Sequence, residues 1–169
     1  MLGIRRSEAA LRSIRAIVVV LAVAGLAACG GGGGPSGPQL SRAQLVTKVN
    51  AECRGLATAV VDLTNAQDPN AHGTKVAHFL GAAASELRNR SHAIGQLNPP
   101  SALAGPVSRF VSLLTRYADQ LSSLASSTKS NETYIDLLSR STSQVNTLNH
   151  LADQANHAAS NLGFHTCAA

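Results

Sequence analysis

Apolar residues recur at steps of three and four along four stretches of the chain, and this spacing constrains the fold more than any other feature. Such residues share one face of an α-helix, so each stretch predicts an amphipathic helix. The four stripes are Leu45, Val49, Cys53, Leu56, Val60 and Leu63; Val76, Leu80, Ala83, Leu87, Ile94 and Leu97; Leu103, Val107, Phe110, Leu114, Tyr117, Leu121 and Leu124; and Ile135, Leu138, Val145, Leu148, Ala152, Ala155, Ala159 and Leu162. Because short loops join these stretches, we expect an all-α fold, an antiparallel four-helix bundle, with differently paired helical hairpins as the alternative.

Local signals place the ends of these helices. Ser41 is a good N-cap for the first, and Asp68-Pro69 reads as a cap and first-turn proline for the second. Pro99-Pro100 ends the second helix. Asn131 is the expected cap of the fourth helix, and Gly163 is its expected C-terminal cap.

The first residues have the order of an export signal. Arginines such as Arg5 and Arg6 form a basic region, and residues 16–28 (AIVVVLAVAGLAA) contain no charge. That run is shorter than the roughly 20 residues of a membrane-spanning helix. The segment ends in Leu26-Ala27-Ala28-Cys29, followed by five glycines.

This arrangement resembles the signal peptide of a bacterial lipoprotein. The resemblance implies cleavage before Cys29 and lipidation of its thiol, with acyl chains such as palmitate that anchor the protein in the cell membrane on the extracytoplasmic face. An uncleaved membrane helix, or an ordinary signal peptide with a chance cysteine, is the alternative.

The resemblance divides the chain into three parts: a signal peptide (1–28), the lipidated cysteine with a flexible Gly/Pro linker (29–38), and a helical domain (39–169). Chain scaling gives the linker a reach of roughly 15–18 Å, so the domain stays close to the membrane and free to tumble. The whole chain has 14 basic and 9 acidic residues, a net charge of +5. Removing 1–28 leaves 10 − 8 = +2. With no dense basic cluster left, nucleic acid is not an expected partner.

Three cysteines are present, and the lipoprotein resemblance assigns Cys29 to lipid. An exported protein meets an oxidising compartment, so Cys53 and Cys167 are expected to form a disulfide. In an antiparallel bundle the end of the fourth helix passes the first half of the first helix, which favours the same pairing. A redox or metal-binding pair is the rival interpretation, although no CxxC motif occurs.

A second resemblance covers the whole exported domain. Cys53 on an apolar helix, the Pro99-Pro100 loop and the tail Leu162-Gly163-Phe164-x-x-Cys167 are similar to uncharacterised small helical lipoproteins of actinobacteria. That group implies no activity for this chain.

His150, Asp153 and His157 share one predicted helix face and are weak candidates for a metal site. The two histidines lie about 10 Å apart along the helix axis, too far to chelate one ion by themselves. We therefore expect a solvated polar face, no metal and no cofactor. Glu86 and Arg90 form an expected surface pair at a spacing of four residues.

No motif for a nucleophile, a zinc hydrolase, a phosphate loop or a dinucleotide site occurs, so we do not expect an enzyme. The leading hypothesis is a membrane-anchored binding or interaction module whose partner is an envelope protein or a cell-wall component. The alternative is a small-molecule or metal-binding helical bundle.

Overall fold

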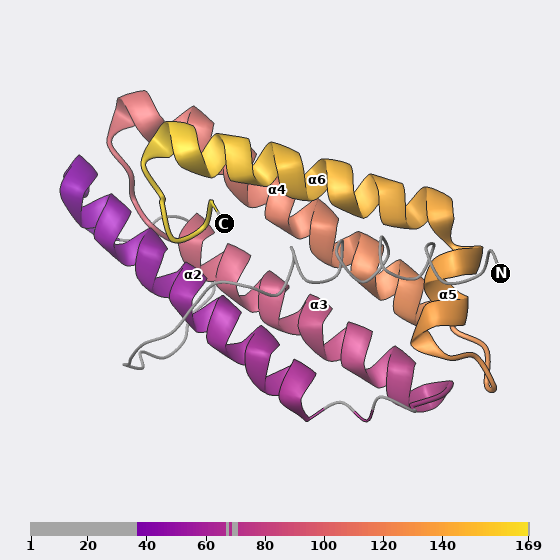
Figure 1. Cartoon of the computed structure of the whole chain (residues 1–169). Coiled ribbons are helices and arrows are strands. Elements are labelled where there is room, and N and C mark those ends of the chain that lie inside the picture. The colour runs from indigo at the N-terminus through magenta and orange to yellow at the C-terminus, as the bar shows by residue number, and fades with distance from the viewer. Residues whose placement is uncertain (1–36, 67, 69–70, 169) are drawn as a thin grey trace, which may run out of the picture.

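The computed structural model describes residues 37–66, 68 and 71–168, and this part of the chain is all-helical. Its helices are α2 (Arg42–Asn65), α3 (Thr74–Gly95), α4 (Ser101–Ser126), α5 (Tyr134–Arg140) and α6 (Thr142–Leu162) (Figure 1). The sequence prediction of an all-α fold is confirmed, and so is the disulfide between Cys53 and Cys167. The predicted signal peptide and the residues up to 36 lie outside the described residues.

Two of the predicted helix ends have the expected chemistry. The Ser41 hydroxyl accepts a hydrogen bond from the Gln44 backbone N–H at 3.2 Å, and the Gln44 side chain accepts one from the Ser41 N–H at 2.9 Å, which makes a capping box. At the end of α6, Gly163 has a φ of +82°. The Phe164 N–H then bonds back to the Ala159 carbonyl at 2.9 Å, as in a Schellman cap.

The start of α3 differs from the prediction. The helix begins at Thr74 rather than directly after Asp68-Pro69, and Pro69 lies outside the described residues. The two residues just before the helix instead bond to the segment that precedes α5. His72 forms an isolated antiparallel bridge with Thr133, and the Gly73 N–H donates to the Glu132 carbonyl at 2.9 Å.

The single fourth helix of the prediction is instead two helices, α5 and α6, which meet at Ser141. Thr133 caps α5 by accepting from the Asp136 N–H, so Asn131 is not the cap. The short helix also turns a different face inward than the stripe predicted. Leu137 is fully buried, whereas Ile135 is 68% exposed.

Smaller differences concern α3 and α4. Ala84 rather than Ala83 is fully buried on α3, and Leu97 lies beyond its last residue, although it still packs against the core. On α4, which begins at Ser101 and includes Pro106, Leu113 is buried, whereas Leu114 of the predicted stripe is half-buried.

Packing runs from α2 to α3, from α3 to α4 and from α4 to α6. One apolar cluster lies where α2 begins and α6 ends, and it includes Phe110 and Phe164, whose ring centroids are 5.7 Å apart. A second cluster lies at the opposite end and joins α3, α4, α5 and α6 around Leu80, Leu124 and Leu137. The stripe residues of α2 beyond Cys53 are only half-buried.

Gly73 lets two loops approach closely. Its φ is +49°, and a Cβ built there would lie 2.1 Å from the Ser130 carbonyl oxygen. Only a residue without a side chain fits this backbone conformation and this contact.

We expect Gly73→Ala to lower the free energy of unfolding by about 2–3 kcal/mol, because it adds both backbone strain and a clash. Gly81→Ala is the matched control. Gly81 is inside α3 with open space around its Cβ position, and the change should stabilise the fold by about 0.5–1 kcal/mol. Denaturant unfolding of both variants is the measurement. Equal stability of the two variants would contradict the packing of these loops.

Candidate functional site

The segment that follows the predicted lipidation site joins the domain at a defined place. Cys29 itself lies outside the described residues. The Leu40 N–H donates to the Asn98 carbonyl at 2.8 Å, and the Asn98 side-chain amide donates to the Gly37 carbonyl at 2.9 Å. These bonds hold residues 37–40 against the α3–α4 loop. We call this end of the molecule, where α2 and α4 begin and α3 and α6 end, the tether end (Figure 1).

No described helix is both long enough and apolar enough to cross a bilayer.

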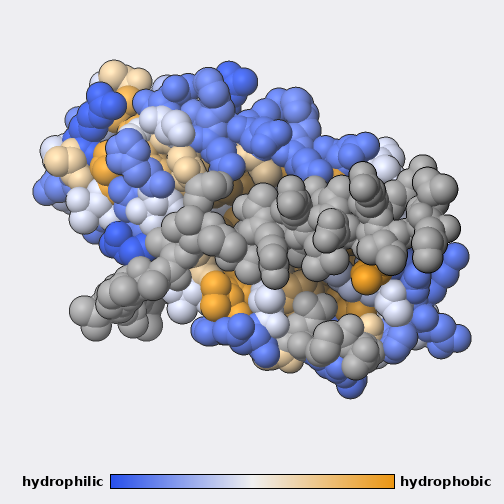
Figure 2. Space-filling view, in the orientation of Figure 1, coloured by the Kyte–Doolittle hydropathy of each residue, from blue (hydrophilic) through white to orange (hydrophobic). Residues whose placement is uncertain are grey.

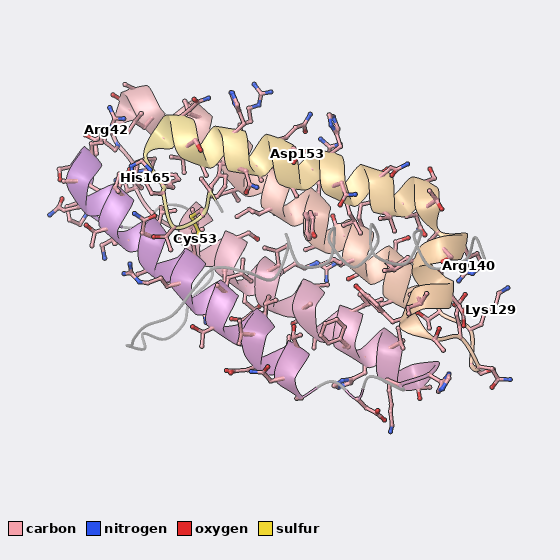
Figure 3. All side chains as sticks on the ribbon, in the orientation of Figure 1. Arg42, Cys53, Lys129, Arg140, Asp153 and His165 are labelled. Atoms are coloured by element: carbon pink, nitrogen blue, oxygen red, sulfur yellow. A yellow bond between two sulfur atoms is a disulfide. The ribbon has the colours of Figure 1, made fainter. Side chains whose placement is uncertain are left out.

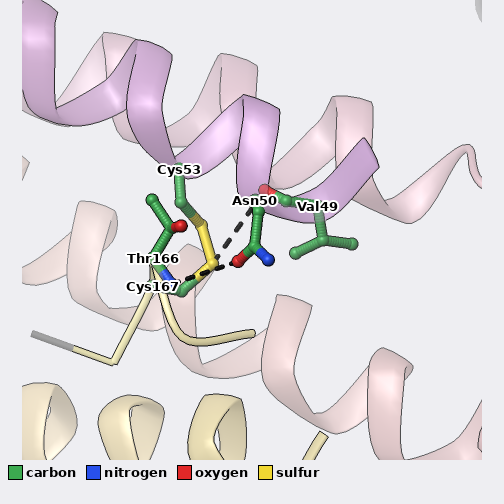
Figure 4. The surroundings of a disulfide bond; sticks show 5 residues. All are labelled: Val49, Asn50, Cys53, Thr166 and Cys167. Atoms are coloured by element: carbon green, nitrogen blue, oxygen red, sulfur yellow. Dashed lines mark hydrogen bonds between the residues drawn. A yellow bond between two sulfur atoms is a disulfide. The ribbon is translucent and has the colours of Figure 1, made fainter. Parts of the chain in front are cut away.

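The disulfide ties the C-terminal tail to α2 close to the tether end (Figure 4). Cys53 and Cys167 are 114 residues apart in sequence, and their Cα atoms are 5.3 Å apart. The Thr166 N–H donates to the Asn50 side-chain oxygen at 3.1 Å. Phe164 is fully buried in the same cluster. The tail is therefore held by a covalent bond, a hydrogen bond and an aromatic side chain.

His150, Asp153 and His157 are exposed along the outer side of α6, as the helical spacing predicted. Each imidazole pairs within its own helix. His150 Nε2 lies 3.0 Å from Gln154 Nε2, and His157 Nδ1 lies 3.1 Å from Asn161 Nδ2. Within the described residues, no three His, Cys, Asp or Glu side chains are grouped in a way that could hold a metal ion.

Arg90 connects α3 to α2. Its Nε donates to Glu86 at 2.7 Å, which confirms the predicted pair, and its Nη1 donates to Glu52 at 3.1 Å. Gly55 makes room for this guanidinium, because a Cβ there would lie 2.7 Å from Arg90 Nη1. The bond to Glu52 was not predictable from the sequence, since it depends on how α2 and α3 are aligned.

Glu132 and Arg140 form an ion pair at the end opposite the tether end. The Glu132 side chain is 7% exposed and accepts from Arg140 Nε at 2.7 Å and from the Lys129 N–H at 3.0 Å. Arg140 also donates to the Ser127 carbonyl at 2.9 Å. The Arg140 hydrogen bond, followed by that from Lys129, lowers the pKa of Glu132 from 4.5 to about 2. The carboxylate thus fixes the α4–α5 loop.

The buried phenol of Tyr117 is held in its protonated form. Burial, with a smaller contribution from Tyr134, raises the pKa of Tyr117 from 10.0 to about 12. Such a group is a poor general base at neutral pH.

Two shallow grooves are open to solvent in the described part of the chain. One, between α2 and α3, has a volume of about 430 Å³ and is lined by Ala59, Asp62, Leu63, Ala66, Ala82 and Glu86. The other, of about 330 Å³, lies between α3 and α4 and is lined by residues that include Arg88, His92 and Thr115. Arg88 is already paired with Asp119 at 2.9 Å.

No protein-family model, no curated protein and no solved structure matches this chain.

We expect reduction of the disulfide to lower the melting temperature of the protein. Closing a loop of about 100 residues contributes roughly 4–5 kcal/mol in the chain-entropy model. A Cys53→Ser, Cys167→Ser double variant should melt like the reduced protein and should no longer respond to reductant. Free thiols at these two positions in unreduced, purified protein would contradict the bridge.

The Glu132–Arg140 pair predicts a loss of stability in acid. Because the pKa of Glu132 is lowered on folding, its contribution is complete above about pH 4.5 and is lost as the pH falls toward about 2. Glu132→Gln should flatten the fall in unfolding free energy over this range, measured by denaturant unfolding at each pH. Asp153→Asn, which alters an exposed carboxylate on α6, is the control and should leave most of the slope in place.

Proposed function

We propose that this chain is a lipoprotein whose Cys29 is lipidated and whose exported part is an antiparallel four-helix bundle held at the extracytoplasmic face of the cell membrane. In this proposal the bundle is a non-enzymatic binding or interaction module. Its partner is an envelope protein or a cell-wall component.

The disulfide is the observation that carries the proposal. Structural disulfides persist in oxidising compartments outside the cytoplasm and are rare inside it. The bridge between Cys53 and Cys167 uses both cysteines of the exported domain, so Cys29 is the thiol left over. Its position directly after an apolar run and directly before a glycine-rich linker suits lipidation.

The use of buried and half-buried polar groups in structural contacts supports binding rather than catalysis. The Glu132 carboxylate serves to hold a loop, and Arg90 serves to join two helices. The Ser91 hydroxyl, which is also in the interior, donates to the Arg88 carbonyl of its own helix at 2.9 Å. The outer side of α6 is hydrophilic and offers amide, hydroxyl and imidazole groups to a partner (Figure 2).

Cys29→Ala tests the anchor. We expect the variant to lose incorporation of radiolabelled palmitate and to accumulate as unprocessed precursor or as released protein, because the acylated thiol is gone. Cys167→Ser is the matched control, since it removes a cysteine of the domain and should still be acylated. An acylated, membrane-bound Cys29→Ala protein would overturn the lipoprotein assignment.

A metal-binding bundle is the alternative function, and titration separates it from the proposal. We expect no stoichiometric, submicromolar binding of zinc or copper(II) by calorimetry, because His150 and His157 are about 10 Å apart along α6. Tight binding that disappears in a His150→Ala, His157→Ala variant would favour the alternative.

A further inference from the structure

Charge is distributed unevenly along the molecule. The stretches that form the tether end, residues 37–51, 91–109 and 154–168, contain no Asp or Glu. They contain Arg42, Lys48 and Arg109, and all three side chains are exposed. From the helix rise, these residues lie within about 12 Å of the tether end of their own helices.

The remaining carboxylates are farther from this end. Asp153, about 14 Å along α6, is exposed, and the others nearest to the tether end pair with arginines. Glu52 and Glu86, roughly 13–15 Å along their helices, both pair with Arg90. Asp119 is farther still and pairs with Arg88. In the described part of the chain, Arg42, Lys48 and Arg109 form no ion pair, so their charge remains available to a partner. Figure 3 shows Arg42 and His165 at this end, with Lys129 and Arg140 at the other.

The same end receives the segment that comes from Cys29. Gly37 and Leu40 are bonded to Asn98, so the chain reaches the domain beside the start of α2. A lipid on Cys29 would therefore hold this end, and not the α5 end, within the roughly 15–18 Å reach of the linker from the bilayer.

We propose that the tether end is a membrane-contact surface that binds anionic phospholipid headgroups and orients the bundle upright on the bilayer. This inference rests on the lipid anchor of the proposed function for its geometry. It adds that the domain, rather than tumbling on its linker, keeps the α5 end pointed away from the membrane.

The expected electrostatic attraction is strong enough to orient the domain. One basic residue close to an anionic surface favours contact by roughly fivefold, so three favour it by roughly a hundredfold. The anchor confines the domain near the surface, so this preference needs only to choose an orientation. The attraction falls off within a Debye length, so salt should weaken it.

The test uses the full lipidated protein with a spin label at either end. Because Cys53 and Cys167 are bridged, Ser101→Cys at the tether end or Asn131→Cys at the α5 end supplies one free thiol, and both positions are exposed. Each labelled protein is reconstituted into vesicles of phosphatidylcholine alone, or of phosphatidylcholine with a minority of phosphatidylglycerol. Broadening of the nitroxide signal by nickel chelated to lipid headgroups reports how close each label is to the surface.

We expect phosphatidylglycerol to bring the Ser101 label close to the headgroups and not the Asn131 label, and we expect high salt to abolish the difference. Arg42→Glu, Lys48→Glu, Arg109→Glu should abolish it too. Lys75→Glu, Arg116→Glu, Lys129→Glu, which changes net charge equally away from the tether end, should preserve it. Equal broadening of the two labels, or equal effects of the two triple variants, would overturn the membrane-contact surface.

The anchor is judged separately by association with pure phosphatidylcholine vesicles. Association there without any effect of phosphatidylglycerol supports the anchor and overturns the oriented contact. Association only with phosphatidylglycerol vesicles, through the Ser101 end, overturns the anchor and supports the contact surface. Association with neither overturns both.

Discussion

The attachment of the C-terminal tail to α2 is the interaction on which the arrangement of helices depends. Helix α2 packs on α3, but its main link to α6 is through residues 163–168. Gly163 turns the chain with a left-handed conformation, Phe164 enters the core beside Phe110, and Cys167 reaches Cys53. These three features join the end of α6 to α2 at the tether end. They also explain why the apolar stripe of α2 is buried up to Cys53 and only half-buried beyond it.

The two ends of the molecule are held by different physical forces. Apolar packing and a covalent bond close the tether end. The opposite end combines its own apolar cluster with polar contacts, in which Glu132 fixes the α4–α5 loop and Gly73 lets that loop meet the start of α3. We therefore expect the tether end to be sensitive to reductant and the opposite end to be sensitive to acid.

Local chemistry made much of the fold predictable from the sequence. The Ser41 capping box, the Pro99-Pro100 stop and the Gly163 cap act within a few residues, and the apolar stripes reveal the helices between them. The pairing of Cys53 with Cys167 followed once Cys29 was assigned elsewhere. The largest failures, at the start of α3 and at the break between α5 and α6, involve contacts with residues outside the local pattern.

The break between α5 and α6 at Ser141 shows why such contacts are not predictable from the sequence. The stripe through Ile135 and Leu138 continues smoothly into α6, so the pattern contains no stop signal. At the break, Arg140 reaches back to Glu132 and to the Ser127 carbonyl, and the apolar spacing does not predict these contacts. The capping pair Thr133 and Asp136 was a usable local signal for the start of α5, because it places a hydroxyl and a carboxylate three residues apart.

The early break of α5 also bears on how a tethered domain would meet a partner. Leu137 turns inward, and Ile135 becomes the only large hydrophobic side chain that is exposed among the described residues. It lies at the end opposite the positive tether end. On an anionic bilayer, the same charge distribution that draws Arg42 toward the headgroups would therefore present α5 and the hydrophilic outer side of α6 to the envelope. In the proposed arrangement, the surface that contacts lipid is therefore separate from the surfaces that a protein or cell-wall partner would bind.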